Sequence, residues 1–189
     1  MPMLSEWVRN LRKILLTRHT WRHVWLSALI VGVFVAAGWI RPPELLFETA
    51  LVLHLLGLVL SLGAVLVIDW TGLAWIAGLR QVREVLRTAE AATPLVWMGL
   101  VLLLASGLFL EPDLSTPLPW VKMGAILVLA NNGLVVGQVE QRLLQLPREV
   151  RREDVPASLR WRVNGSIVAS HLGWWLAVAV GVVTMVQRR

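Results

Sequence analysis

Residues Leu46–Trp70 read LFETALVLHLLGLVLSLGAVLVIDW, and this stretch decides the fold class. It contains 25 residues, and its only ionisable side chains are Glu48, His54 and Asp69. About 20 apolar residues in a helix are enough to cross the roughly 30 Å hydrocarbon core of a bilayer. The stretch therefore predicts a transmembrane helix. Four other segments have the same character: Val24–Ile40, Pro94–Leu110, Trp120–Gln138 and Gly165–Val186.

These segments predict an all-α fold, a polytopic membrane helix bundle with five transmembrane helices in one domain over residues 24–189. The composition agrees, because 57% of residues are hydrophobic and only 16% are charged, against about 25% charged in soluble domains. There is no cysteine, which excludes disulfides and thiolate metal sites. The net charge of +6 does not indicate nucleic acid, because the basic residues lie in loops on one side of the membrane.

The distribution of Lys and Arg predicts the orientation. Basic residues gather at the N-terminus and in the loops after the second and fourth segments, and such loops face the cytoplasm. We therefore expect a multi-pass protein of a bacterial plasma (inner) membrane, with its N-terminus in the cytoplasm and its C-terminus outside. The basic residues concerned are Arg9, Arg12, Lys13, Arg18, Arg22, Arg80, Arg83, Arg87, Arg142, Arg148, Arg151, Arg152, Arg160 and Arg162.

The first 23 residues form a separate predicted unit. Over Met3–Leu16, apolar side chains recur at helical spacing opposite a charged face, which predicts an amphipathic helix lying in the cytoplasmic interface. The alternative is a signal peptide that is cleaved after Val35-Ala36-Ala37. Residues 1–23 and the first apolar segment are both long for that role.

Polar residues inside spans are functional candidates, because lipid does not solvate them. His54 lies on a stripe of small residues formed by Ala50, Gly57, Ser61 and Ala64. Such a stripe allows the close approach of another helix or of a flat macrocycle.

His171 is the second intramembrane histidine. Asn131 and Asn132 are predicted at its depth, where an amide could hold its second ring nitrogen. Ser106 is predicted near the depth of His54. Two histidines on different helices could ligate one haem, although the predicted span ends leave an offset of about 8 Å between them.

Other polar residues have plainer interpretations. Lys122 follows Trp120 at the start of a span and is expected to extend to the head groups. Because Asn131 lies half a turn from Lys122 after nine residues, the two cannot both face inward. Asp69 is interpreted as an interfacial anchor. The stripe Gly124, Asn131 and Gln138 is expected to face the bundle interior, and residues Val139–Asn164 to form a surface helix and a linker.

Two stretches resemble a known superfamily. Residues 53–64, LHLLGLVLSLGA, look like the opening helix of CopD-like and HemJ-like membrane proteins, and residues 119–129, PWVKMGAILVL, look like their third helix. The resemblance covers about residues 45–187 and implies a four-helix core plus one added helix. In HemJ-like members it implies haem b bound through the histidine at position 54, with Lys122 functionally important.

The activities of that superfamily do not transfer directly. HemJ-like members oxidise protoporphyrinogen, but their Arg and Tyr-His pattern is replaced here by Val67-Ile68-Asp69-Trp70. CopD-like members are linked to copper uptake, but Met98, Met123 and Met185 form no cluster.

The leading hypothesis is a membrane b-type haem protein with an electron-transfer or haem-linked redox role. His54 is the expected axial metal ligand and His171 the second if the helix offset permits. The supporting groups at the cofactor site are expected to be Asn131, Asn132, Ser106 and Lys122. The partner of such a haem protein would be a redox protein. One alternative is a transporter of a small molecule or metal ion, acting as a homodimer through the Gly124, Asn131 and Gln138 stripe. Another is a non-catalytic accessory or assembly subunit.

Overall fold

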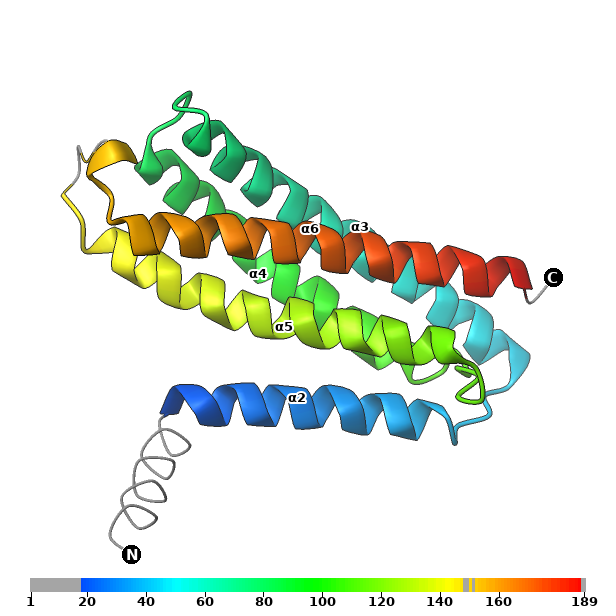
Figure 1. Cartoon of the computed structure of the whole chain (residues 1–189). Coiled ribbons are helices and arrows are strands. Elements are labelled where there is room, and N and C mark those ends of the chain that lie inside the picture. Colours follow the sequence, from blue (N-terminus) through cyan, green and yellow to red (C-terminus); the bar gives the residue numbers. More distant parts are fainter. Residues whose placement is uncertain (1–17, 148–149, 151, 188–189) are drawn as a thin grey trace, which may run out of the picture.

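A computed structural model describes residues 18–147, 150 and 152–187 (Figure 1). This part of the chain is all-helical. Its elements are α2 (Arg18–Ala37), α3 (Glu44–Ile76), α4 (Val82–Gly107), α5 (Pro117–Leu144), the short 3-10 helix η1 (Arg152–Asp154) and α6 (Ala157–Gln187). The amphipathic helix predicted over Met3–Leu16 lies outside the described residues.

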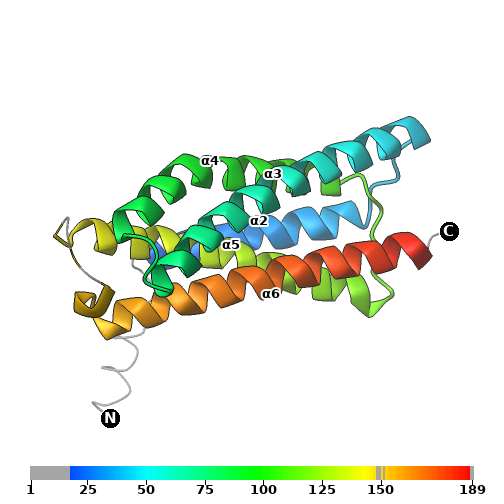
Figure 2. The ribbon, with the colours of Figure 1, turned by 90° about the horizontal axis from the view of Figure 1, so that it is seen from above.

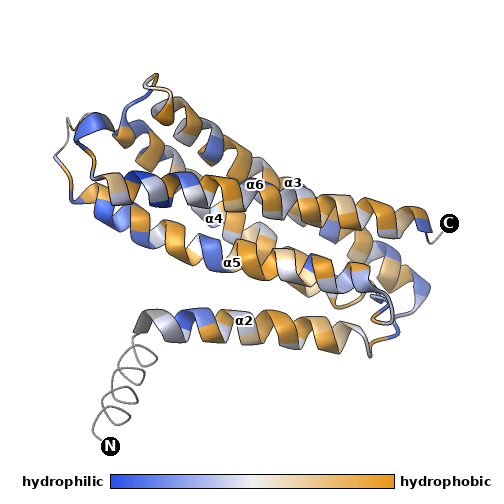
Figure 3. Ribbon diagram, in the orientation of Figure 1, coloured by the Kyte–Doolittle hydropathy of each residue, from blue (hydrophilic) through white to orange (hydrophobic). Residues whose placement is uncertain are grey.

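Five helices are long and apolar enough to cross a membrane, which confirms the predicted fold class. The 33 residues of α3 correspond to about 50 Å, which exceeds the hydrocarbon thickness of about 30 Å. Many large apolar side chains are exposed on the helices, as lipid contact requires, and Figure 3 shows hydrophobic residues along most of each helix. Val59, Val101 and Leu172 are 72%, 63% and 68% exposed.

The helices extend beyond the predicted spans at one end of the bundle. α4 begins at Val82 rather than Pro94, and Pro94 lies inside the helix. The surface helix predicted within Val139–Asn164 is wrong, because α5 continues to Leu144 and α6 begins at Ala157. Hydropathy marks the part of a helix inside lipid, whereas these extensions continue past it and bury residues such as Val82 and Ala89 against neighbouring helices.

The core consists of two helical hairpins. α3 packs closely along α4, and α5 along α6, whereas contacts between the two hairpins are sparse (Figure 2). At the α3–α4 crossing, a Cβ on Gly99 would lie 2.5 Å from the Ser61 Cβ and 2.7 Å from the Gly57 carbonyl oxygen. The Ser61 hydroxyl donates to the carbonyl of Val96 at 2.9 Å. The small residues Gly57 and Ser61 of α3 therefore pack directly against α4.

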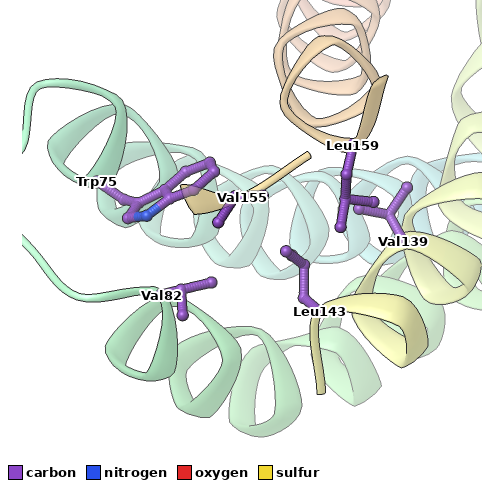
Figure 4. Packing of buried hydrophobic residues seen from close by; sticks show 6 residues of the cluster. All are labelled: Trp75, Val82, Val139, Leu143, Val155 and Leu159. Atoms are coloured by element: carbon purple, nitrogen blue, oxygen red, sulfur yellow. The ribbon is translucent and has the colours of Figure 1, made fainter. Parts of the chain in front are cut away.

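A buried apolar cluster joins the hairpins at one end (Figure 4). Its members come from α3, α4, α5, α6 and the segment between η1 and α6, and they are Trp75, Val82, Val139, Leu143, Val155 and Leu159. We call this end of the bundle the basic end, because its surface carries Arg80, Arg83, Arg87, Arg142, Arg160 and Arg162. The cluster closes this end by burying side chains from both hairpins together.

α2 lies outside the two hairpins and packs against α4 and α5 (Figure 1). Ile30 is 1% exposed and contacts the buried Leu100 and Ala130. The arrangement is a four-helix core with one added helix, as predicted.

Candidate functional site

An acid and a histidine from different hairpins meet between α3 and α6. The Asp69 side chain is 9% exposed, and its Oδ2 lies 3.0 Å from Nδ1 of His171. The same Nδ1 donates to the carbonyl oxygen of Ile167 at 3.2 Å, and Oδ2 is buried without an aligned hydrogen bond. Water, a ligand or a proton commonly satisfies such a carboxylate.

The helix face that carries Asp69 explains its position. Ser61, Val65, Asp69 and Gly72 follow one another at spacings of four, four and three residues, and all are buried. A Cβ on Gly72 would lie 3.1 Å from Ile167, so the glycine lets α6 approach closely beside Asp69. The prediction that Asp69 is an interfacial anchor is wrong. The sequence did contain a signal, because Asp69 continues the helix face formed by Ser61 and Val65. Its position near the end of the predicted span led instead to the interfacial interpretation.

A cavity of about 300 Å³ lies between the hairpins, with Asp69 in its wall. We call it the chamber. Its polar lining includes Asp69, Glu140, Asn132 and Gln138, and its larger surface is apolar. The Oε1 of Glu140 is buried without a hydrogen-bond partner. Sequence reasoning placed Glu140 in a surface loop and missed it, because the extension of α5 to Leu144 was not predicted.

Asn132 lies in the wall of the chamber and links the helices of one hairpin. Its amide nitrogen donates to the carbonyl oxygen of Ser166 at 2.9 Å, which joins α5 to α6. The prediction that it holds the second ring nitrogen of His171 is wrong.

Asn131 faces α2, so the same prediction is also wrong for it. Its Oδ1 accepts from Nδ1 of His23 at 2.6 Å, and its Nδ2 donates to the Ser27 hydroxyl at 3.0 Å and to the carbonyl of Leu127 at 2.8 Å. We call His23, Ser27 and Asn131 the α2 clamp. Sequence reasoning missed His23. Its spacing of one helical turn from Ser27, which places both side chains on one face of the helix, could have indicated it.

The stripe Gly124, Asn131 and Gln138 does not share one environment. Asn131 is covered by α2 and Gln138 lines the chamber. A Cβ on Gly124 would meet no atom within 4 Å. The expectation that the whole stripe faces the interior is wrong, and Asn131 is not free to form the contact of a homodimer.

His54 lies at a second polar centre. Its Nδ1 is 3.0 Å from the Ser106 Oγ, which confirms that these residues lie at one depth. Because the Ser106 hydroxyl donates to the carbonyl of Leu102 at 2.6 Å, its oxygen accepts from His54. Nδ1 then carries the proton and Nε2 is an acceptor.

Lys122 lies beside α6. Its Nζ is 3.9 Å from the position that a Cβ on Gly181 would occupy, and the residue is half-buried. That Lys122 extends to the head groups stays a prediction. Because Asn131 faces α2, the prediction that these two side chains point in different directions is confirmed.

The two intramembrane histidines belong to separate sites. His54 precedes Asp69 by 15 residues of one helix, or about 22 Å along its axis, and Asp69 contacts His171. The offset does not permit one iron between both histidines. Within the described ranges, no group of three or more His, Asp or Glu side chains could hold a metal ion.

Comparisons with family models, curated proteins and solved structures give no match to this chain.

Proposed function

We propose that this membrane protein binds a small amphipathic molecule in the chamber and carries it across the bilayer. The observation that supports this proposal is the position of the Asp69 carboxylate, which is buried in the chamber wall beside His171 and has an oxygen without an aligned hydrogen bond. Ligand sites are commonly apolar cavities of roughly 300–1,000 Å³ with a few converging polar groups.

The construction of the core supports a carrier. Each hairpin is internally close-packed, whereas the hairpins meet sparsely around the chamber. Packed units of this kind move as bodies when a site opens. Asp69 comes from one hairpin and His171 from the other, so a ligand held by both residues would bind differently in open and closed arrangements.

We further propose that the basic end faces the cytoplasm of a bacterium, because basic loops are retained on that side. The chamber then lies toward the cytoplasmic leaflet. With only five helices, the carrier would work as an oligomer, and its contact would use a surface other than the one that α2 covers.

Single-cysteine labelling tests the carrier. The chain has no native cysteine, so Gly137→Cys provides a unique thiol in the chamber wall, where an added Cβ meets no atom within 4 Å. In sealed vesicles we expect a water-soluble methanethiosulfonate to react with it from each side, because a carrier exposes its site alternately. The matched control is Gly63→Cys, which also has open surroundings but does not line the chamber.

The outcomes separate three cases. Reaction from both sides at Gly137→Cys but not at Gly63→Cys supports a carrier. Reaction from one side only limits the protein to binding. No reaction from either side means that the chamber is closed to solutes, and the proposal is then wrong.

A second candidate is a b-type haem held by His54 alone. The bond to Ser106 fixes the tautomer that leaves Nε2 as the ligating atom, as in metal-bound histidines. Lys122 would lie beside such a group. Haem would supply one-electron redox chemistry. The purified protein should then show a Soret band that His54→Ala removes and His171→Ala retains, and a wild-type spectrum without that band excludes the candidate.

A further inference from the structure

The chamber contains a second carboxylate that the proposed function does not explain. Asp69 belongs to α3 and Glu140 to α5, so each hairpin contributes one acid. The Oε1 of Glu140 is buried without a hydrogen-bond partner, whereas Oδ2 of Asp69 has no aligned hydrogen bond but lies 3.0 Å from Nδ1 of His171. Buried polar atoms without a partner are rare in folded proteins, and a water, an ion or a ligand can satisfy them.

The fixed charge of the chamber is negative. Its one arginine, Arg22, is exposed on α2. Across residues 18–147, 150 and 152–187, Asp69 and Glu140 form no ion pair with lysine or arginine. Asp69 contacts the imidazole of His171, whereas Glu140 forms no ion pair within the described ranges. Two acids and one arginine leave an excess of negative charge, which favours a positively charged ligand.

Two aromatic side chains also line the chamber. Trp97 comes from α4 and Trp174 from α6, and Trp174 is 6% exposed. Indole faces attract cations, with a contribution of about 2 kcal/mol or more where water is excluded. Most of the remaining lining is aliphatic, which suits the apolar body of a ligand rather than a hydrated ion.

We propose that the ligand of the chamber is an organic cation with an apolar body, whose charged nitrogen is held by Asp69 and Glu140. This inference rests on the proposed binding function and names its substrate class. A bare metal ion fits less well, because the described residues offer no group of three His, Asp or Glu side chains to coordinate it.

The test compares three probes of similar size on the full chain in nanodiscs. Benzyltrimethylammonium is cationic, phenylmethanesulfonate is anionic and benzyl alcohol is neutral. Binding is measured by calorimetry. We expect the cation to bind, the anion not to bind and the alcohol to bind at least about tenfold more weakly, which corresponds to about 1.4 kcal/mol.

Four variants test whether the carboxylates of Asp69 and Glu140 hold the cation. Glu140→Gln and Asp69→Asn should each weaken cation binding by about tenfold or more, because the attraction between a carboxylate and the ammonium charge is lost. Glu140→Asp keeps the charge and should retain most of the affinity, which separates charge loss from misfolding. The matched control is Glu84→Gln, an exposed acid that pairs with Arg80 at the basic end, and it should bind as the wild type does.

A chamber-filling variant separates this inference from the proposed function. Gly137→Leu should abolish binding of the cation, and Gly63→Leu should not. If Gly137→Leu blocks binding but the three probes bind equally and Glu140→Gln changes nothing, the cation inference is wrong and the binding function stands. If Gly137→Leu binds every probe as the wild type does, the chamber is not the site and both proposals are wrong.

Discussion

The carboxylate of Asp69 and the imidazole of His171 lie 3.0 Å apart, although one belongs to the first hairpin and the other to the second. Contacts between the hairpins are otherwise sparse outside the apolar cluster at the basic end, so this contact is a polar link between them in the wall of the chamber.

Removing His171 should destabilise the protein more than removing both members of the pair. His171→Ala leaves the buried Asp69 carboxylate uncompensated, which costs about 3–5 kcal/mol for a fully buried pair and less here, because the His171 side chain is 33% exposed. We expect a loss of about 1–3 kcal/mol, partly restored in Asp69→Asn/His171→Ala. Unfolding in detergent measures the stability of the single and the double variant. A double variant that is less stable than His171→Ala would contradict the prediction.

Gly99→Ala should separate the helices of the first hairpin. The new Cβ would lie 2.5 Å from the Ser61 Cβ and 2.7 Å from the Gly57 carbonyl oxygen, and neither can move without shifting backbone. Overpacking of this kind costs about 1–3 kcal/mol. Thermal unfolding should show the loss, whereas Gly63→Ala, where a Cβ meets no atom within 4 Å, should unfold like the wild type.

The α2 clamp should hold α2 on the core by an amount that a double-mutant cycle can measure. Asn131 accepts from His23 at 2.6 Å, and interhelical hydrogen bonds in membranes average about 0.6 kcal/mol, with a maximum of about 1.7. His23→Ala and Asn131→Ala should therefore couple by about 0.5–1.5 kcal/mol. A coupling energy of zero would mean that the apolar contacts of Ile30 hold α2 on the core without a contribution from the His23–Asn131 hydrogen bond.

The mature protein should retain α2. Cleavage after Ala37 would remove both side chains that satisfy Asn131 and expose an amide to lipid, which is costly. Intact-mass measurement of protein purified from membranes should find the residues of α2 present. A mature chain that begins near Gly38 would support the signal-peptide alternative.

Reporter fusions should place the termini on opposite sides of the membrane. Five helices among the described residues are long and apolar enough to span a membrane, and the basic residues favour a cytoplasmic N-terminus. A reporter that is active only in the cytoplasm should give signal when fused to the N-terminus and none when fused to the C-terminus. Signal from the C-terminal fusion would reverse the proposed orientation and place the chamber toward the outer leaflet.

Apolar length by itself determined the fold class. A run such as Leu46–Trp70 has one stable form in lipid, because only a helix satisfies every backbone group there. Relative depth also followed from position along a helix, which is why the proximity of His54 and Ser106 was predictable. Both properties depend on local geometry, and the rise of a helix is the same in every context.

Only the tertiary structure decided which polar groups meet. Depth does not specify the rotation of a helix or the identity of its neighbour, so Asn131 could be placed at the level of His171 and still face His23 on α2. The helix extensions beyond lipid, which bring Glu140 into the chamber wall, are stabilised by packing that hydropathy does not report. Side-chain partners across helices depend on how whole helices pack, and that choice is made by the summed contacts of the bundle rather than by any single segment.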